Sequence, residues 1–308
     1  MSDGQRIEHI PVLIEEVMVL LRCEPGRTYI DATLGGGGHA SEILRRTAPD
    51  GILIGLDWDE EAISKARKAF IPFGERAQIF HENFIHLGEI LKKVKVDVVD
   101  GMLLDLGLSS FQLEKEERGF SFRGEGPLDM RMDRRLDQTA AYLVNRLSAN
   151  ELKDILYQYG EERWAKRIAN AIVRERAQGS IETTQALRKL VHRTIPRRFH
   201  PRKIDPATKT FQALRIRVND ELENLRKMLE TGWKFLRKGG RMCIISFHSL
   251  EDRIVKESFR KLEKGGADGL SPGTVMHVLT KKPVTPSEEE QKRNPRSRSA
   301  KLRCAERV

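Results

Sequence analysis

The sequence predicts an α/β protein whose parallel sheet is interrupted by an inserted α-helical domain. Over the first 110 residues, short apolar runs alternate with helix-like segments; helical segments without strands follow, and the alternation returns near Phe211. Apolar strands that alternate with helices are typical of a parallel sheet covered on both faces. We therefore expect one discontinuous domain, residues 1–110 and 211–308, and one inserted helical domain, residues 111–210.

The first domain contains four short segments rich in apolar and β-branched residues, which predict strands: 28–33, 51–57, 77–80 and 96–106. Helices are expected between them: one from near His39, one from Asp59 through Phe70, and one over 87–94. Acidic residues in the first turn of the second helix favour its start.

The insertion begins with residues 111–135, which show no clear period, and continues with four predicted helices: 137–147, 148–159, 162–177 and 184–194. Ser148, with Glu151 three residues later, matches a capping box. The returning part predicts a long helix, a strand, a helix and a hairpin pair: 219–236, 241–247, 250–262 and about 274–280.

Charge is distributed unevenly along the 308 residues. The net charge is +10, yet residues 1–110 carry −6, whereas residues 188–217 carry +9 and residues 291–308 carry +6. Runs of like charge are often plain solvated faces, but these two segments hold more than the whole excess. We therefore expect the stretch from Arg188 to Arg217 and the tail from Lys292 to Arg307 to face phosphates.

The composition is that of a soluble globular protein, with 39% hydrophobic and 32% charged residues and no apolar run long enough to span a membrane. The first residues lack the apolar core of a signal peptide. Three scattered cysteines, Cys23, Cys243 and Cys304, are too few for a disulfide framework. We expect a cytoplasmic protein.

A run of four glycines, 35–38, lies between the first strand and the next helix. Glycine allows a tight turn and close approach of a ligand to the helix N-terminus, and Gly35, Gly37 and Ala40 match the G-x-G-x-x-A fingerprint. Asp57 ends the second strand 22 residues after Gly35, where a carboxylate can bind both ribose hydroxyls. The pattern favours a Rossmann-like nucleotide site; the alternative is a glycine turn with a helix-capping aspartate.

Asp31 distinguishes between two nucleotide cofactors. It ends the first strand, four residues before Gly35. A carboxylate there would repel the pyrophosphate of a nicotinamide cofactor but attract the cationic amino-acid end of S-adenosylmethionine. A carboxylate that only stabilises the glycine turn is the alternative.

Seven motifs, in order, resemble the RsmH (MraW) family: residues 36–39 (GGGH), 103–110 (LLDLGLSS), 117–122 (ERGFSF), 127–133 (PLDMRMD), 159–163 (YGEER), 210–216 (TFQALRI) and 245–253 (ISFHSLEDR). The resemblance runs from His9 to the Asn294-Pro-Arg-Ser-Arg-Ser-Ala tail. Members of this family are bacterial enzymes that use S-adenosylmethionine to methylate N4 of a cytidine in the decoding region of 16S ribosomal RNA. The resemblance implies a class I S-adenosylmethionine-dependent methyltransferase sheet with a helical RNA-recognition insertion.

The resemblance also implies cofactor contacts by Gly37, Gly38, His39, Asp57, Phe84, Asp105 and Gln112. Phe84 follows the third strand and could pack on the adenine, although a phenylalanine is commonly a core residue. His39, taken alone, is a helix-start residue.

Four residues are candidates for the chemistry: Asp105, Ser109, Ser110 and His248. The exocyclic amine of cytosine is a poor nucleophile, so an enzyme must orient it and accept its hydrogen bonds. The serines could instead cap the next helix, and His248 could be a satisfied core histidine.

Methylation at C5 would need a thiolate, and no cysteine lies in a site motif. The eight histidines show no metal-ligand spacing, so no metal is expected.

The partner implied by the resemblance is 16S rRNA in the small ribosomal subunit, and monomer and homodimer both stay open. Two other functions compete with the methyltransferase. A nonenzymatic rRNA-binding assembly factor could retain the fold, and a nicotinamide-dependent oxidoreductase is supported by the glycine fingerprint but opposed by Asp31.

Overall fold

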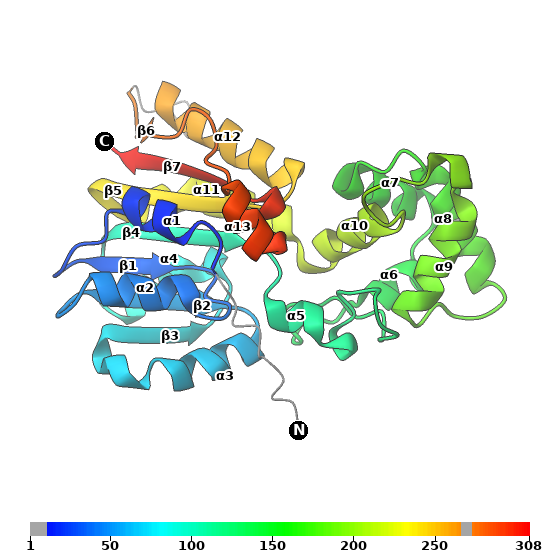
Figure 1. The fold of residues 1–308 in the computed structure, drawn as a ribbon, viewed down its shortest axis with the longest axis horizontal. Helices are drawn as coiled ribbons and strands as arrows, with labels where there is room; N and C mark the ends of the chain where they lie inside the picture. Colours follow the sequence, from blue (N-terminus) through cyan, green and yellow to red (C-terminus); the bar gives the residue numbers. More distant parts are fainter. Residues whose placement is uncertain (1–10, 266–272) are drawn as a thin grey trace. The chain divides into compact units, whose positions relative to one another are not determined.

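The computed structural model describes residues 11–265 and 273–308 and divides into two compact units. The strand-helix unit consists of the described parts of Met1–Gly107 and Leu222–Val308, and the helical unit is Leu108–Glu221 (Figure 1). These junctions lie three residues before and eleven residues after the predicted ones, at 110 and 210. The second differs because helix α10 (Thr208–Asn219) packs on helix α7 (Ala149–Gly160), both within the helical unit.

A seven-stranded sheet in the order β3-β2-β1-β4-β5-β7-β6 forms the centre of the strand-helix unit. The strands are β1 (Thr28–Asp31), β2 (Ile52–Asp57), β3 (Ala77–His81), β4 (Val99–Leu106), β5 (Leu236–Ser246), β6 (Met276–Val278) and β7 (Lys301–Arg307). β1 to β5 are parallel, and β7 is antiparallel to both β5 and β6. This is the order of a doubly wound Rossmann-like sheet with one reversed strand, which confirms the predicted fold class.

Helices cover both faces of this sheet, in agreement with the apolar runs of its strands. One face packs on α1 (Ile14–Leu21), α2 (Gly38–Arg46) and α3 (Glu60–Ala69), and the other on α4 (Leu87–Lys93), α11 (Glu221–Thr231) and α12 (Ser249–Lys264). The strands alternate their side chains between these two cores: Ile30 faces the second and Tyr29 the first. The remaining elements of the unit are η1 (Ile71–Arg76), η2 (Phe84–His86), η5 (Gly232–Phe235), α13 (Glu288–Arg293) and η6 (Pro295–Ser299).

The helical unit contains α5 (Ser110–Glu114), η3 (Glu116–Arg118), α6 (Ala140–Arg146), α7, α8 (Ala165–Arg176), α9 (Thr184–Thr194), η4 (Arg197–Phe199) and α10. The four predicted helices correspond to α6–α9, and the capping box of Ser148 and Glu151 is present. The helix predicted over 219–236 corresponds to α11, but its last part is wrong, because α11 ends at Thr231 and η5 and then β5 follow. Asp220, at φ 48°, ends α10, and α11 then begins at Glu221.

The tail was expected to face phosphates, and the structure contradicts this for its last part. Residues 301–307 form β7, and Leu302, Arg303, Cys304 and Ala305 are buried in the sheet between β5 and β6. Asp252 of α12 accepts hydrogen bonds from Arg303 Nε at 2.6 Å and Lys301 Nζ at 3.3 Å. Arg303 and Lys301 of β7 thus pair with a carboxylate inside the unit. The hairpin predicted near 274–280 is instead the strand β6, which pairs with β7.

Candidate active site

Three aspartates lie at the carboxyl ends of neighbouring parallel strands. Asp31 ends β1, Asp57 ends β2, and Asp105 is the next-to-last residue of β4. In the sheet register Asp31 pairs with Gly55 of β2 and with Leu103 of β4, so all three carboxylates reach the same edge. Ligands of open α/β sheets bind at this edge, beside the point where the strand order reverses.

The glycine run forms a tight turn tied to Asp57. Gly35 and Gly37 have φ of 50° and 78°, a region that favours glycine, and the Gly35 N–H donates to Asp57 Oδ2 at 2.7 Å. A Cβ on Gly38 would lie 2.3 Å from the Pro11 side chain, and one on Gly37 would lie 2.8 Å from the Phe70 ring. Close packing therefore requires glycine at 37 and 38, whereas at Gly35 the positive φ rather than crowding favours glycine.

Asp57 is positioned by two backbone donors. Besides the Gly35 N–H, the Asp59 N–H donates to its Oδ1 at 2.9 Å. A carboxylate has about four acceptor sites in all, so acceptor capacity remains beyond these bonds. Asp57 can thus hold the loop and still accept hydrogen bonds from two vicinal hydroxyls.

All three carboxyl groups resist ionisation in the absence of a ligand. Burial raises the pKa of Asp31 to about 7, that of Asp57 to about 6, and that of Asp105 to about 7, where the charge of Glu251 adds to the effect. A cation placed among them would lower these pKa values again. The electrostatics of this edge therefore favour a positively charged ligand.

Asp105 has the most available acceptor in this group. Its Oδ1 is buried and has no hydrogen-bond partner among the described residues, while its backbone N–H donates to Thr33 Oγ1 at 2.6 Å. Buried polar atoms without partners are rare in folded proteins. The orphaned oxygen fits a site that a ligand completes.

His39 lies against Asp105 in a defined tautomer. Its Nε2 lies 2.9 Å from Val12 O, a carbonyl that only accepts, so Nε2 carries the proton. Its Nδ1 is then an acceptor, 3.6 Å from Asp105 Oδ2. Burial lowers the pKa of His39, so the ring stays neutral beside the carboxyl group.

Phe84 is a core residue in the structure, which was the alternative considered from the sequence. It is 6% exposed, belongs to the core under β1, β2 and β4, and its ring lies 6.1 Å from that of Trp58. Sequence reasoning missed Trp58, although an aromatic residue directly after the strand-ending Asp57 was a visible signal. Trp58 is the more exposed of the two rings.

His248 is held as a helix cap at the end of β5. Its Nδ1 accepts a hydrogen bond from the Glu251 N–H at 3.4 Å, and Glu251 Oε2 accepts from Phe247 N at 2.8 Å and from His248 N at 3.2 Å. His248 Nε2 lies 3.1 Å from Glu251 Oε1 at an angle that makes no hydrogen bond. Glu251 is 3% exposed and was not identified from the sequence.

The remaining candidates belong to the helical unit. Ser109 caps α5 in a capping box: its Oγ accepts from Gln112 N at 3.3 Å, and Gln112 Oε1 accepts from Ser109 N at 3.0 Å. Gln112 is buried. Ser110 is the first residue of α5, and its side chain lies outside the described structure, as does His9.

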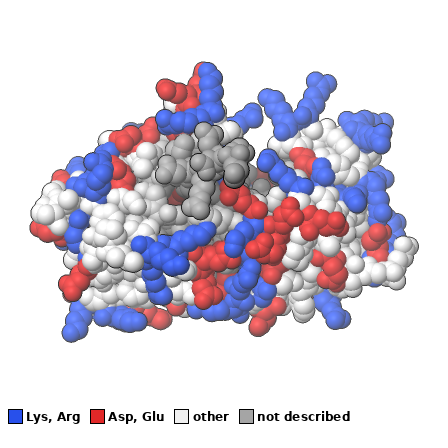
Figure 2. Space-filling model, turned by 60° about the horizontal axis from the view of Figure 1, so that its bottom comes forward, with Lys and Arg blue, Asp and Glu red and all other residues white. Residues whose placement is uncertain are grey.

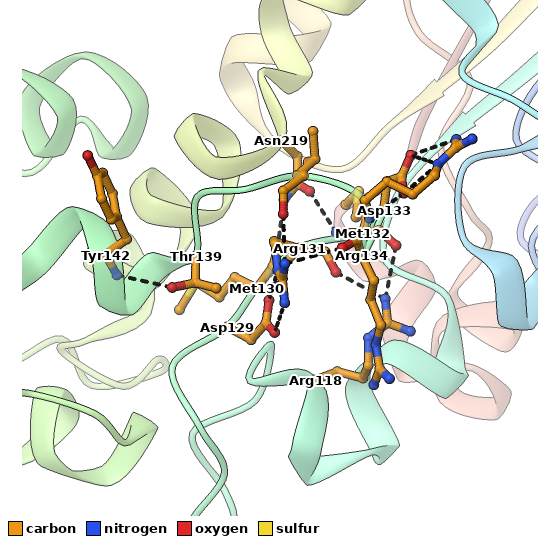
Figure 3. Close-up of polar contacts among 12 residues, drawn as sticks. Arg118, Asp129, Met130, Arg131, Met132, Asp133, Arg134, Thr139, Tyr142 and Asn219 are labelled. Atoms are coloured by element: carbon orange, nitrogen blue, oxygen red, sulfur yellow. Dashed lines mark hydrogen bonds and ion pairs between the residues drawn. The ribbon is translucent and has the colours of Figure 1, made fainter.

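The 127–133 motif forms a rigid loop in the helical unit (Figure 3). Asn219, at the end of α10, accepts from Met132 N at 2.7 Å and donates to Met130 O at 2.8 Å. The buried Arg118 donates to the carbonyls of Arg131 and Met132, both at 3.0 Å. These contacts hold Met130 at φ 63°. Such strain persists only where the surroundings fix it, which makes this loop a preformed surface.

The basic stretch divides into paired and unpaired cations. Several of its residues pair within the unit: Arg188 with Asp205, Arg193 with Glu175, Arg215 with Glu221 and Arg217 with Asp220. Four others are exposed and form no ion pair within the described part of the chain: Arg197, Arg198, Arg202 and Lys203. Figure 2 shows Lys and Arg side chains projecting from the helical unit, at the right of the view.

Neither a membrane-spanning helix nor a metal-binding cluster is found among the described residues. Across residues 11–265 and 273–308, no helix combines the length and apolar character that crossing a membrane requires. In the same ranges, no three His, Cys, Asp or Glu side chains gather in a way that could hold a metal ion.

Comparison with known proteins identifies the family. Two proteins named ribosomal RNA small subunit methyltransferase H are each 50% identical to this chain: one from Desulfotalea psychrophila, covering 99% of this chain and 100% of the relative, and one from Geotalea uraniireducens, covering 100% of both. A solved structure of an rRNA methylase from Streptococcus thermophilus gives a TM-score of 0.39 at 10% identity, covering 100% of this chain and 99% of that chain. The family model described as the MraW methylase family matches residues 6–308. The chain therefore belongs to the MraW methylase family.

Proposed function

We propose that this protein transfers the methyl group of S-adenosylmethionine to the exocyclic N4 of a cytidine in the decoding region of 16S rRNA, in the cytoplasm. The general activity, an S-adenosylmethionine-dependent rRNA methyltransferase, follows from the family and from the shared name of the relatives. The atom and the region rest on the sequence motifs. The observation that carries the proposal is the set of three aspartates at adjacent strand ends: Asp31 and Asp57 are buried, and Asp105 is partly buried with an unpartnered Oδ1.

The cofactor fits the residues at this edge of the sheet. Asp57 would bind the two ribose hydroxyls through its free acceptor sites, and Asp31 would face the ammonium group of the amino-acid end. Trp58 directly follows β2, and Phe84 begins η2 after β3, where an adenine would be bordered by rings. Gly37, Gly38 and His39 supply the loop and the start of α2. When bound, S-adenosylmethionine supplies an electrophilic methyl group on a sulfonium centre.

Asp105 is the group we assign to the cytosine amine. Its unpartnered Oδ1 would accept a hydrogen bond from an N4 proton and so direct the nitrogen lone pair away from itself. Methyl transfer would form a C–N bond and break the S–C bond of the cofactor, and N4 would then have to lose one proton. Asp105, whose pKa burial raises in the ligand-free site, is the group that we propose takes that proton. Ser109, Ser110 and His248 remain secondary candidates; the contacts of Ser109 and His248 are those of helix caps.

The RNA would be held by the helical unit. Its exposed cations, above all Arg197, Arg198, Arg202 and Lys203, are free to bind phosphates. N4 takes part in base pairing, so the target cytidine must be unpaired or extruded. The nonenzymatic alternative is disfavoured, because an assembly factor has no need of three strongly perturbed carboxyl groups at the ligand edge.

Mass spectrometry of 16S rRNA from cells lacking this protein tests the proposal. We expect N4-methylcytidine to be lost from the decoding region and restored by the wild-type gene. Full retention of the modification would refute the proposed function. Asp105→Asn, which keeps an acceptor oxygen but cannot take the proton, should bind S-adenosylmethionine normally and slow methyl transfer by about 10²- to 10⁴-fold. An unchanged rate would remove Asp105 from this role.

A further inference from the structure

Two aromatic rings from separate segments of the helical unit meet at its surface. Trp164 precedes α8 and Phe199 ends η4, and their ring centroids are 5.2 Å apart at an interplanar angle of 49°. Phe199 is 45% exposed. Burial alone therefore does not account for this ring.

Two arginines extend the same surface. The Arg167 guanidinium lies 5.8 Å from the Trp164 ring centroid, and that of Arg198 lies 4.8 Å from the Phe199 centroid. A guanidinium group is planar and weakly hydrated, and it stacks on aromatic rings. The four side chains together make one aromatic, cationic surface, which we call the stacking surface.

The loop that carries Phe199 is fixed at both ends. His200 Nε2 donates to Ile195 O at 2.9 Å, before the loop. After it, Asp205 accepts from Ala207 N at 2.8 Å, from His192 Nε2 at 2.8 Å and from Arg188 Nε at 2.9 Å. The stacking surface is thus preorganised, so little conformational entropy is lost when a ligand binds.

Several cations without carboxylate partners lie close along the chain to the residues of the stacking surface. Five exposed residues close to it along the chain form no ion pair within the ranges that the structure describes: Arg163, Lys166, Arg197, Arg202 and Lys203. A ligand that matches both the rings and the unpaired cations must combine repeated negative charge with flat apolar faces. Single-stranded nucleic acid has this combination, whereas an acidic peptide has charge without the faces.

We propose that the stacking surface binds an unpaired nucleobase of the RNA substrate, distinct from the cytidine that is methylated. The base stacks on the Phe199–Trp164 rings and the flanking guanidinium planes, and the neighbouring phosphates pair with the surrounding cations. This inference rests on the proposed function for the identity of the RNA, but the stacking itself can be measured without methyl transfer.

The test measures binding of the full chain to a labelled single-stranded RNA oligonucleotide, to the same strand with abasic sites, and to the corresponding duplex. Phe199→Ala should weaken binding of the intact strand by about 5- to 100-fold, the usual effect of removing one stacking partner. The same substitution should leave binding of the abasic strand unchanged. Phe199→Tyr should bind like the wild type, and Tyr157→Ala, which removes a 67% exposed aromatic side chain elsewhere in the unit, is the matched control.

Salt dependence separates stacking from charge. Phe199→Ala should lower affinity at every salt concentration without changing the slope of log K against log salt, whereas Arg202→Ala should reduce that slope by about 0.7. The proposal is overturned if Phe199→Ala binds the intact strand as well as wild type does, or if it weakens the abasic strand equally. Competition by poly-glutamate that depends on Phe199 would assign the surface to an acidic protein instead. If the wild-type protein binds RNA in a Phe199-dependent way but transfers no methyl group, the proposed function is rejected and the stacking surface is not.

Discussion

The strand-helix unit and the helical unit use their charged side chains in opposite ways. In the first, Asp31, Asp57 and Asp105 are withdrawn from solvent at strand ends, and their pKa values rise to between about 6 and 7. In the second, the cations of the 197–203 segment are exposed and without ion pairs in the described structure. Burial strengthens each interaction with one small cation, whereas exposure suits an extended polyanion bound by many weak, salt-screened contacts.

The largest expected effect tests whether the β7 cations belong to the structure or to the RNA surface. Asp252→Ala leaves the buried Arg303 and its neighbour Lys301 without their carboxylate, so we expect the free energy of unfolding in urea to fall by about 3–5 kcal/mol. Glu257→Ala, an exposed glutamate on the same helix, should change it by less than about 0.5 kcal/mol. If both variants lower the free energy of unfolding by the same small amount, the β7 cations do not depend on Asp252 and stay candidates for binding phosphates.

The second prediction concerns the buried carboxylates. Asp57→Ala removes an acceptor of two ribose hydroxyls, and charged hydrogen bonds contribute about 1.5–3 kcal/mol each, so affinity for S-adenosylmethionine should fall at least about 100-fold by calorimetry. The control is Asp50→Ala, which removes a carboxylate that caps Gly26 in the same unit. If both variants bind the cofactor normally, the ribose is held elsewhere.

The third prediction addresses the exposed cations. Replacing Arg197, Arg198 and Arg202 together with alanine should lower RNA affinity about 30-fold and reduce the salt slope by about 2, because each phosphate contact on a single strand contributes about 0.7. Cofactor affinity should not change. Arg45→Ala, which removes an exposed cation already paired with Glu42, should leave RNA binding unaltered. An equal loss of cofactor affinity in the triple variant would mean that the run is structural.

The smallest predicted effect is a dependence of cofactor binding on pH. A cation prefers ionised carboxylates, so affinity for S-adenosylmethionine should rise about tenfold between pH 6 and pH 8 for a group with a pKa of about 7. The raised pKa values also mean that the folded state binds more protons than the unfolded state between about pH 4 and pH 7. Across that window, these three groups therefore lower the stability of the ligand-free protein as pH rises. Asp31→Asn should flatten the pH dependence of both cofactor affinity and stability. If neither changes, Asp31 is not the group that titrates.

Local signals predicted much of the fold correctly. β1, β2 and β4 are apolar on both faces because helices cover both, and the Ser148 capping box starts α7 where the sequence indicated it. Asp31 and Asp57 were identifiable as site candidates because each ends an apolar strand. These features depend on neighbours only a few residues away.

Features set by distant residues were not predictable. No element was expected before Thr28, yet α1 begins after Leu13, whose N–H donates to Glu290 Oε1, 277 residues away. β7 looked like a basic tail because the Asp252 that neutralises Arg303 lies 51 residues earlier. His248 was a candidate for the chemistry, and only the structure shows its ring within the cap of α12.

The position of β7 also bears on how the chain reaches its fold. Residues 301–307 lie inside the sheet, between β5 and β6, although they follow both in the sequence. Before they are synthesised, β5 is an open edge and β6 has no partner strand. The helical unit, by contrast, is complete at Glu221. During translation the helical unit can therefore fold before the sheet is complete. The strand-helix unit begins first in the sequence but is completed last.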